Sequence, residues 1–158
     1  GSLRAGRDLA TVGVGETTRS NRVYVEPGLI LPLHATASGI AYAAFARPEV
    51  LKGLMARDLA AHTEATPVTH DALRAAVESA RARGWAMADQ TLESEVCGIA
   101  LPLFGPDGWA VGALAVATPA ARMTPETRAR ILAALAPAAR AATEGLGGRV
   151  PDTHRIAA

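Results

Sequence analysis

The sequence predicts an α+β domain in which helices pack on an antiparallel sheet. The clearest observation is a hairpin, because two long apolar runs at 96–104 and 109–118 flank the turn sequence Gly-Pro-Asp-Gly at 105–108. A second is the capped helix predicted over 69–83, and a third is the long helix that begins after Thr124. Both hairpin strands are apolar on both faces, so we expect the hairpin at the centre of the sheet with helices on each side.

The N-terminal third of the chain is expected to hold short strands followed by two helices. Apolar and β-branched residues predict strands at 9–15, 21–26 and 29–33, the last at a sheet edge or a bend because it contains a proline. Apolar residues four positions apart predict a helix over 36–46. A second short helix is predicted over 48–55, with a proline in its first turn.

Residues at helix ends set the bounds of the two later helices. Thr69 is expected to cap one of them, and Gly84 to end it in a left-handed conformation, with a strand following at 85–88. Thr124 is expected to cap the last helix, which Pro137 would kink.

One domain is expected from residue 1 to residue 148, because 158 residues fit a single core. A glycine-rich stretch at 145–148 ends the last helix. Residues 149–158 carry no periodic apolar pattern and are predicted to form a flexible C-terminal tail.

The composition excludes several classes of protein. Hydrophobic residues make up 49% of the chain and charged residues 20%, which suits a folded domain with a core. The formal net charge of +1 gives no basic excess for nucleic acid or for an anionic membrane surface, and no apolar run is long enough to span a membrane. The single cysteine, Cys97, allows no internal disulfide, so we expect a cytoplasmic protein.

The sequence contains no recognised catalytic motif. It lacks the P-loop, HExxH, GxSxG and CxxC patterns. The four histidines have no metal-ligand spacing, so we expect neither a metal nor a cofactor; they are His34, His62, His70 and His154. Cys97 lies alone on an apolar strand and is expected to be an inert core thiol. We therefore expect a protein that is not an enzyme, with a small enzyme acting through Cys97 as the alternative.

Four segments of the chain follow one another in a specific order. They are LPLHATASG at 31–39, ALRAAVESARARGWAMAD at 72–89, LESEV at 92–96 and GIALPLFGPDGWAVGALAVATPAARMT at 98–124. Together they resemble the C-terminal effector-binding domain of IclR-family transcriptional regulators. The similarity covers roughly residues 20–145.

The resemblance implies a GAF-like domain that binds a small-molecule effector. In the family, a winged helix-turn-helix domain at the N-terminus reads DNA. Nothing in residues 1–30 can form that domain, so we expect it to be absent and DNA to be a partner only through it. The family's sensor domains pair with one another, which implies a homo-oligomer, either a dimer or a tetramer.

Small residues at the start of the helix predicted over 36–46 form the first part of the candidate site. Unpaired N–H groups at a helix N-terminus attract anions. The resemblance implies that the amides of Ala37, Ser38 and Gly39 hold the carboxylate of an effector. The alternative is that these small residues only allow the helix to pack closely on the sheet.

The second part of the candidate site departs from the family pattern. The resemblance implies that Asp89 matches the second acid of an acidic loop. Family members that bind small keto acids carry one Cys and two Ser on the hairpin, and here these positions are Gly98, Ala115 and Ala117. With Val96, these three residues are expected to form a wall that has no hydrogen-bonding side chain.

An apolar wall favours an aromatic carboxylate over a small polar acid. Buried oxygen atoms without a hydrogen-bond partner would cost a keto acid ~1–3 kcal/mol each. We therefore expect a ligand such as 4-hydroxybenzoate. Two alternatives stay open, namely a sensor of a small aliphatic keto or hydroxy acid, and a dimerisation module that binds no ligand.

Overall fold

The computed structural model describes residues 2–5, 8–11 and 30–157, with side chains described over 32–157. Its strands form one six-stranded sheet in the order β3-β2-β1-β6-β5-β4, and neighbouring strands are antiparallel. The strands are β1 (Ser2–Ala5), β2 (Asp8–Thr11), β3 (Ile30–Leu31), β4 (Ala86–Asp89), β5 (Val96–Phe104) and β6 (Ala110–Pro119). The helices are α1 (Ala37–Phe45), α2 (Pro48–Met55), α3 (His70–Arg83) and α4 (Pro125–Gly145), with a short 3₁₀ helix, η1, at Ala120–Arg122.

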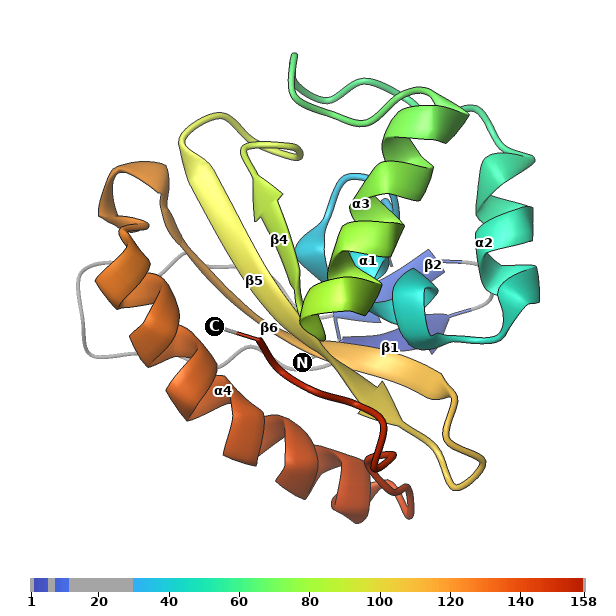
Figure 1. Cartoon of the computed structure of the whole chain (residues 1–158). Coiled ribbons are helices and arrows are strands. Elements are labelled where there is room, and N and C mark those ends of the chain that lie inside the picture. The colour runs from blue at the N-terminus through green and yellow to red at the C-terminus, as the bar shows by residue number, and fades with distance from the viewer. Residues whose placement is uncertain (1, 6–7, 12–29, 158) are drawn as a thin grey trace.

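Helices cover both faces of the sheet, which confirms the predicted α+β class (Figure 1). α1 and α3 lie on one face, with α2 beside them, and α4 crosses the other. We call these the α1 face and the α4 face. β5 and β6 form the predicted hairpin, and each has a further strand on its outer side.

The strands near the N-terminus match the strands predicted from the sequence only in part. β2 covers the start of the strand predicted at 9–15. The rest of that prediction, and the strand predicted at 21–26, lie outside the described residues. β1 is not among the predicted strands, and it joins the sheet by pairing with β2 on one side and β6 on the other.

Side chains alternate between the two faces along the hairpin strands. On the α4 face, large residues of the sheet and of α4 pack together, namely Trp85, Ile99, Leu101, Leu103, Leu132 and Leu135. The sheet residues on the α1 face are small, namely Ala86, Ala88, Ala100 and Ala113. Because a methyl group is the longest of these side chains, α1 can approach the backbone of the sheet closely.

Threonine hydroxyls cap three of the helices. Thr36 caps α1, and Thr69 and Thr124 cap α3 and α4 as predicted. Each hydroxyl accepts a hydrogen bond from the amide three residues later, at 3.0, 3.1 and 3.2 Å respectively. Gly84 ends α3 with a φ of 86°, the left-handed conformation expected of it. α4 continues as one helix through Pro137.

The C-terminal segment, residues 149–157, packs on the domain instead of extending from it (Figure 1). β4 pairs only with the first half of β5, so the edge of β5 beyond Ala100 has no β4 residue beside it. The Ala157 amide donates to the Arg83 carbonyl at 2.7 Å, and the Ala157 carbonyl accepts from Trp85 Nε1 at 2.8 Å. These contacts differ from the flexible tail that the sequence predicts, because the groups that bind the segment lie elsewhere in the chain.

Candidate functional site

The N-terminus of α1 leaves two backbone amides without a partner. The Thr36 hydroxyl accepts from the Gly39 amide, and the Thr36 carbonyl accepts from the Ile40 amide at 3.1 Å. The amides of Ala37 and Ser38 donate to no acceptor in the described part of the chain. Two adjacent N–H groups at the positive end of a helix are therefore available to an anion.

Ser38 adds a third group at the same helix end. Only 4% of its surface is exposed, and its hydroxyl has no hydrogen-bond partner within the residues that the structure describes. The hydroxyl could donate to a ligand oxygen bound at this helix end.

Gly39 has a structural role that sets it apart from its two neighbours. A Cβ atom at this position would lie 2.0 Å from the Leu33 carbonyl oxygen. The chain before α1 thus folds back directly against the helix, which only glycine allows. Since the Gly39 amide is bound to Thr36, the structure leaves two free amides where the sequence suggests three. At Gly39 the geometry supports the alternative interpretation, in which the small residue allows close packing and does not bind a ligand.

The predicted wall lies on the α1 face, beneath this helix end. Strand register places Gly98 opposite Ala117, and Ala100 opposite Ala115. Val96 is two residues from Gly98 along β5 and has the same orientation. A Cβ atom on Gly98 would lie 3.4 Å from Ala37 Cβ, so this strand faces the first residue of α1. The structure therefore brings six of the eight predicted residues to one place, together with the free amides: Ala37, Ser38, Val96, Gly98, Ala115 and Ala117.

The open part of the wall lies over β6. Ala37 already fills the space above Gly98, so no ring can sit between them. In contrast, Ala115 is exposed, and Ala117 and Val96 are half-buried. A ligand bound by the α1 amides would therefore extend across the alanines of β6.

Asp89 lies on the other face of the sheet. It pairs in register with Cys97, and its Oδ1 accepts a hydrogen bond from Cys97 Sγ at 3.0 Å. This places its carboxylate on the α4 side, away from Gly98, whose side-chain position alternates with that of Cys97. The structure therefore does not bring Asp89 together with the rest of the predicted site. The hydrogen bonds from Cys97 and then from Gln90 lower the pKa of Asp89.

Cys97 is held in its neutral form. Burial, followed by the hydrogen bond to Asp89 and the charge of Asp89, raises the pKa of this thiol to about 12. A thiol with such a pKa supplies almost no thiolate near neutral pH. Cys97 therefore lacks the property that a nucleophilic cysteine needs.

Two loops are fastened beside the α1 N-terminus by threonine side chains that sequence reasoning missed. The Thr63 and Thr66 hydroxyls donate to the carbonyls of Gln90 and Thr91, both at 2.6 Å. The Thr91 hydroxyl donates to the Ala35 carbonyl at 2.7 Å. These bonds join residues 25 to 56 positions apart, so no local pattern could have indicated them.

The β4–β5 loop also carries two unusual backbone conformations. Gln90 and Glu95 have φ values of 60° and 65°, a region that residues other than glycine seldom adopt. The Gln90 side chain accepts from the Glu95 amide at 3.0 Å and so closes the loop on itself. A fixed loop of this kind keeps the end of β5 in place next to the candidate site.

Other kinds of site find no support in the described part of the chain. Residues 2–5, 8–11 and 30–157 contain no group of three or more His, Cys, Asp or Glu side chains that could hold a metal ion. Among these residues, no helix is both long and apolar enough to cross a membrane.

Comparison with known proteins gives a consistent result. A family model for the C-terminal domain of bacterial IclR transcriptional regulators matches residues 2–144. A protein of Cupriavidus necator described as "probable transcriptional regulator SauR" is 32% identical over 124 residues, which are 78% of this chain and 49% of that protein.

Solved structures agree with this match. A crystal structure of an IclR-type regulator from Silicibacter sp. TM1040 has a TM-score of 0.91 and 36% identity, and the match covers 98% of this chain and 61% of that one. An IclR homologue of Microbacterium hydrocarbonoxydans, complexed with 4-hydroxybenzoate, has a TM-score of 0.77 over 91% of this chain and 59% of that one. Its identity is 22%, so this second likeness concerns the fold.

The chain thus spans about half the length of the curated relative and about three fifths of the solved regulators. The family model covers most of the chain, and the sheet with helices on both faces is the GAF-like fold of that family's regulatory domain. The chain belongs to the IclR family of bacterial transcriptional regulators and comprises its C-terminal regulatory domain.

Proposed function

We propose that this chain is the effector-binding domain of an IclR-type regulator and that its effector is an aromatic carboxylate such as 4-hydroxybenzoate. One observation carries the proposal. Two free amides and the Ser38 hydroxyl lie at the N-terminus of α1, beside a wall that has no hydrogen-bonding side chain.

The α1 N-terminus suits the carboxylate of such an acid. The amides of Ala37 and Ser38 can donate to its oxygen atoms, and the helix dipole favours the negative charge. The Ser38 hydroxyl is a further donor. No cationic side chain is needed for this contact, which agrees with the apolar surroundings of α1.

The alanines of β6 suit the ring. Ala115 and Ala117 offer methyl groups and no polar atom, and Gly98 adds none. A ring would bury apolar area against this surface, whereas the oxygens of a small keto acid would find no hydrogen-bonding side chain there. The 4-hydroxybenzoate complex of the Microbacterium hydrocarbonoxydans homologue supports the choice of this acid as the first probe.

A catalytic role has less support. The pKa of about 12 for Cys97 removes the one nucleophile that the alternative enzyme would use. The relatives that match this chain are transcriptional regulators. In the whole protein we expect effector binding to act on DNA through a separate domain, and we expect the regulatory domains to associate as a dimer or a tetramer.

Isothermal titration calorimetry with 4-hydroxybenzoate, benzoate, pyruvate and glyoxylate tests the proposal. We expect the two aromatic acids to bind and both keto acids to bind at least tenfold more weakly. Ala117→Leu should weaken 4-hydroxybenzoate at least tenfold, because the added carbons occupy the surface meant for the ring. Ala121→Leu, at an exposed position of η1 outside the wall, is the matched control.

Two outcomes would contradict the proposal. Tight binding of pyruvate or glyoxylate alone would assign the domain to small aliphatic acids. The absence of binding by all four acids, in a protein that unfolds cooperatively, would favour a dimerisation module without a ligand. A ligand present at 100 times its Kd should also stabilise the fold by ~2.7 kcal/mol, which thermal unfolding can check independently.

A further inference from the structure

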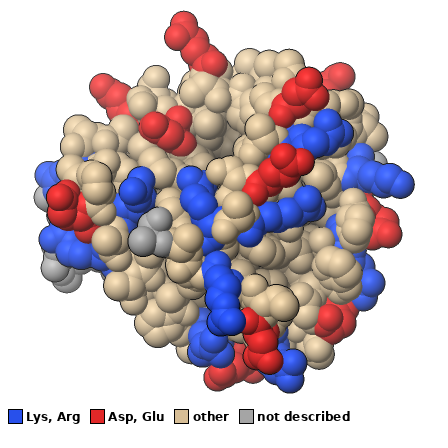
Figure 2. All heavy atoms as spheres, in the orientation of Figure 1, with Lys and Arg blue, Asp and Glu red and all other residues tan. Residues whose placement is uncertain are grey.

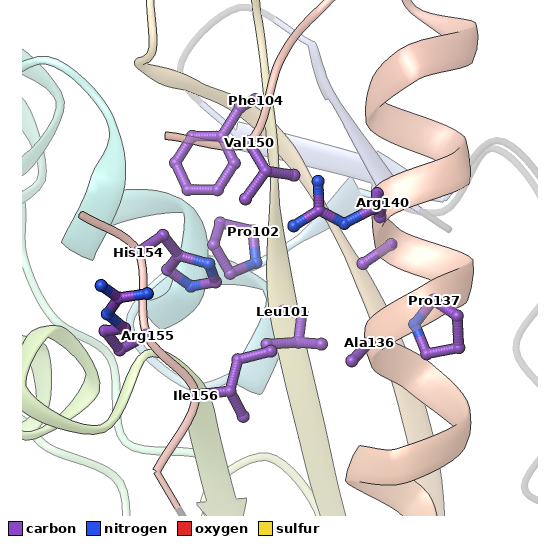
Figure 3. A pocket seen from close by; sticks show the side chains of 11 residues that line it. Leu101, Pro102, Phe104, Ala136, Pro137, Arg140, Val150, His154, Arg155 and Ile156 are labelled. Atoms are coloured by element: carbon purple, nitrogen blue, oxygen red, sulfur yellow. The ribbon is translucent and has the colours of Figure 1, made fainter. Parts of the chain in front are cut away.

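A groove lies between α4 and the C-terminal segment, at the end of β5 that β4 does not reach (Figure 3). Its volume is about 470 Å³, within the range of sites that hold small organic ligands. Leu101 and Pro102 of β5, Ala136 of α4 and Ile156 of the C-terminal segment line it. The groove is thus built from three parts of the chain that are distant in sequence.

The sides of the groove are largely apolar and have little side-chain volume on the helix. α4 contributes Ala136, Pro137 and Ala139, none of which extends far across the groove. Pro102 lacks an amide hydrogen, so this stretch of β5 has one donor fewer to offer to a neighbouring strand. The groove exists because the α4 side chains beside it are short and because no β4 residue lies along this edge of β5. Longer side chains on α4 would fill it.

The C-terminal side of the groove is fixed in position. The His154 ring donates from Nε2 to the Gly84 carbonyl at 2.8 Å. His154 also packs edge-on against Phe45 and Phe104, with ring centroids 5.1 and 5.2 Å away. A Cβ atom on Gly84 would lie 1.8 Å from the Arg155 carbonyl oxygen, so the segment crosses directly over this glycine. The groove therefore has a defined shape.

Positive charge gathers at the groove without a counterpart. Arg140 and Arg155 both line it, and neither has an ion-pair partner within residues 32–157. No Asp or Glu is among the lining residues. Figure 2 shows Lys and Arg side chains in the middle of this face, with Asp and Glu side chains among them. Burial and the charge of Arg140 lower the pKa of His154, so this ring does not add a third charge at neutral pH.

We propose that this groove is a second ligand site, which binds an amphipathic carboxylate with its apolar part against Leu101 and Ala136 and its charge at Arg140 and Arg155. Apolar walls alone would accept any apolar molecule, and exposed arginines alone would accept any anion. Their combination in one groove of this size selects a molecule that has both parts. A medium-chain fatty acid has this chemistry.

The site is separate from the one proposed at the α1 N-terminus. The groove borders α4, whereas the amides of Ala37 and Ser38 lie on the α1 face. Along β5, the groove begins at Leu101, and Gly98 lies toward the other end of the strand. Occupancy of the two sites can therefore be followed independently in one experiment.

Two-dimensional ¹H–¹⁵N NMR of this chain, titrated with octanoate, tests the proposal. We expect saturable shifts at Leu101, Phe104 and 150–157, with 1-octanol binding at least fivefold more weakly because it lacks the charge. Arg140→Gln should weaken octanoate about fivefold, the effect typical of one partly exposed charge contact. Arg130→Gln, on the same helix but outside the groove, is the matched control and should bind octanoate like the unmodified protein.

The readout distinguishes failure of this proposal from failure of the first. Shifts confined to Ala37, Ser38 and Gly98 would mean that octanoate uses the other site, and would overturn the groove. Equal affinities for octanoate and 1-octanol would also overturn the groove proposal. The same holds if the Arg140→Gln and Arg130→Gln variants bind octanoate with equal affinity. If the groove resonances instead change with protein concentration and ignore octanoate, a second copy of the chain covers this face and the proposal is wrong.

Discussion

The two faces of the central sheet have the same backbone and opposite side-chain volumes. On the α4 face, Ile99, Leu101 and Leu103 fill the space under α4. On the α1 face, the same strands present mostly alanine and glycine, and Gly98 lies against the first residue of α1. The first face derives its stability from the volume that it buries. The second brings a helix end so close to the sheet that only small side chains fit between them.

This difference determines which substitutions each face of the sheet can tolerate. A face packed with large residues should lose stability when one is shortened. A face that depends on close approach should suffer when a residue is enlarged. Four substitutions or conditions probe this contrast, from the largest expected effect to the smallest.

Ile99→Ala should produce the largest effect, because it opens a cavity in the middle of the α4 face. We expect a loss of about 2–5 kcal/mol in the free energy of unfolding, measured by urea denaturation. Ala100→Gly, on the adjacent position of the α1 face, is the matched comparison and should lose only about 1 kcal/mol. Equal losses for both variants would remove the distinction between the faces.

Gly39→Ala tests the opposite requirement. The new methyl group would lie 2.0 Å from the Leu33 carbonyl oxygen, so the backbone before α1 has to move. We expect a loss of about 1–3 kcal/mol by the same measurement. Gly53→Ala is the control, since nothing lies within 4 Å of a Cβ atom there. A Gly39→Ala protein as stable as the Gly53→Ala one would show that the close approach is unnecessary.

Thr36→Ala and Thr124→Ala separate stability from binding. Each removes a hydroxyl that caps its helix, at a cost of about 1 kcal/mol in thermal or urea unfolding. Thr36→Ala should cost more than Thr124→Ala, because the Thr36 hydroxyl is buried and also donates to the Pro32 carbonyl at 3.1 Å. Each substitution frees one backbone amide. The amide that Thr36→Ala frees, that of Gly39, lies beside the proposed carboxylate site, and the one that Thr124→Ala frees does not. The affinity of the Thr36→Ala variant for 4-hydroxybenzoate should therefore change while that of Thr124→Ala stays constant. If calorimetry shows the same affinity for both, the α1 amides do not hold the ligand.

The pH dependence should show the smallest effect. Burial, and then the charge of Arg140, lower the pKa of His154, so the folded protein binds its proton less readily than the unfolded chain does. Stability is therefore highest above the unfolded value of about 6.5 and falls as the pH drops through it. We expect the Tm to decrease between pH 7.5 and 5.5, and His154→Gln to lessen the decrease. A Tm profile that His154→Gln leaves unchanged would exclude this histidine as the cause.

The sequence predicted the local features of the domain well. The Thr69 and Thr124 caps, the left-handed Gly84 and the β5–β6 hairpin all appear in the structure. Each depends on interactions among residues a few positions apart, which spacing and residue type reveal. The orientation of Val96, Gly98, Ala115 and Ala117 followed from strand alternation for the same reason.

The sequence was less informative wherever distant segments meet. The family resemblance groups Asp89 with the candidate site, whereas in the structure its register partner Cys97 binds it on the opposite face. The resemblance also implies that the Gly39 amide is a free donor, whereas in the structure this amide donates to the Thr36 hydroxyl.

The sequence by itself determined the family, the helix ends, the hairpin and the lack of hydrogen-bonding side chains on the β6 wall. The tertiary structure decided which of the α1 amides stay free, on which side of Gly98 there is room for a ligand, and that residues 149–157 complete a groove beside α4. The physical reason is that caps and alternation arise within a few residues of chain. A groove or a close approach depends on which surfaces meet when segments far apart in sequence pack together.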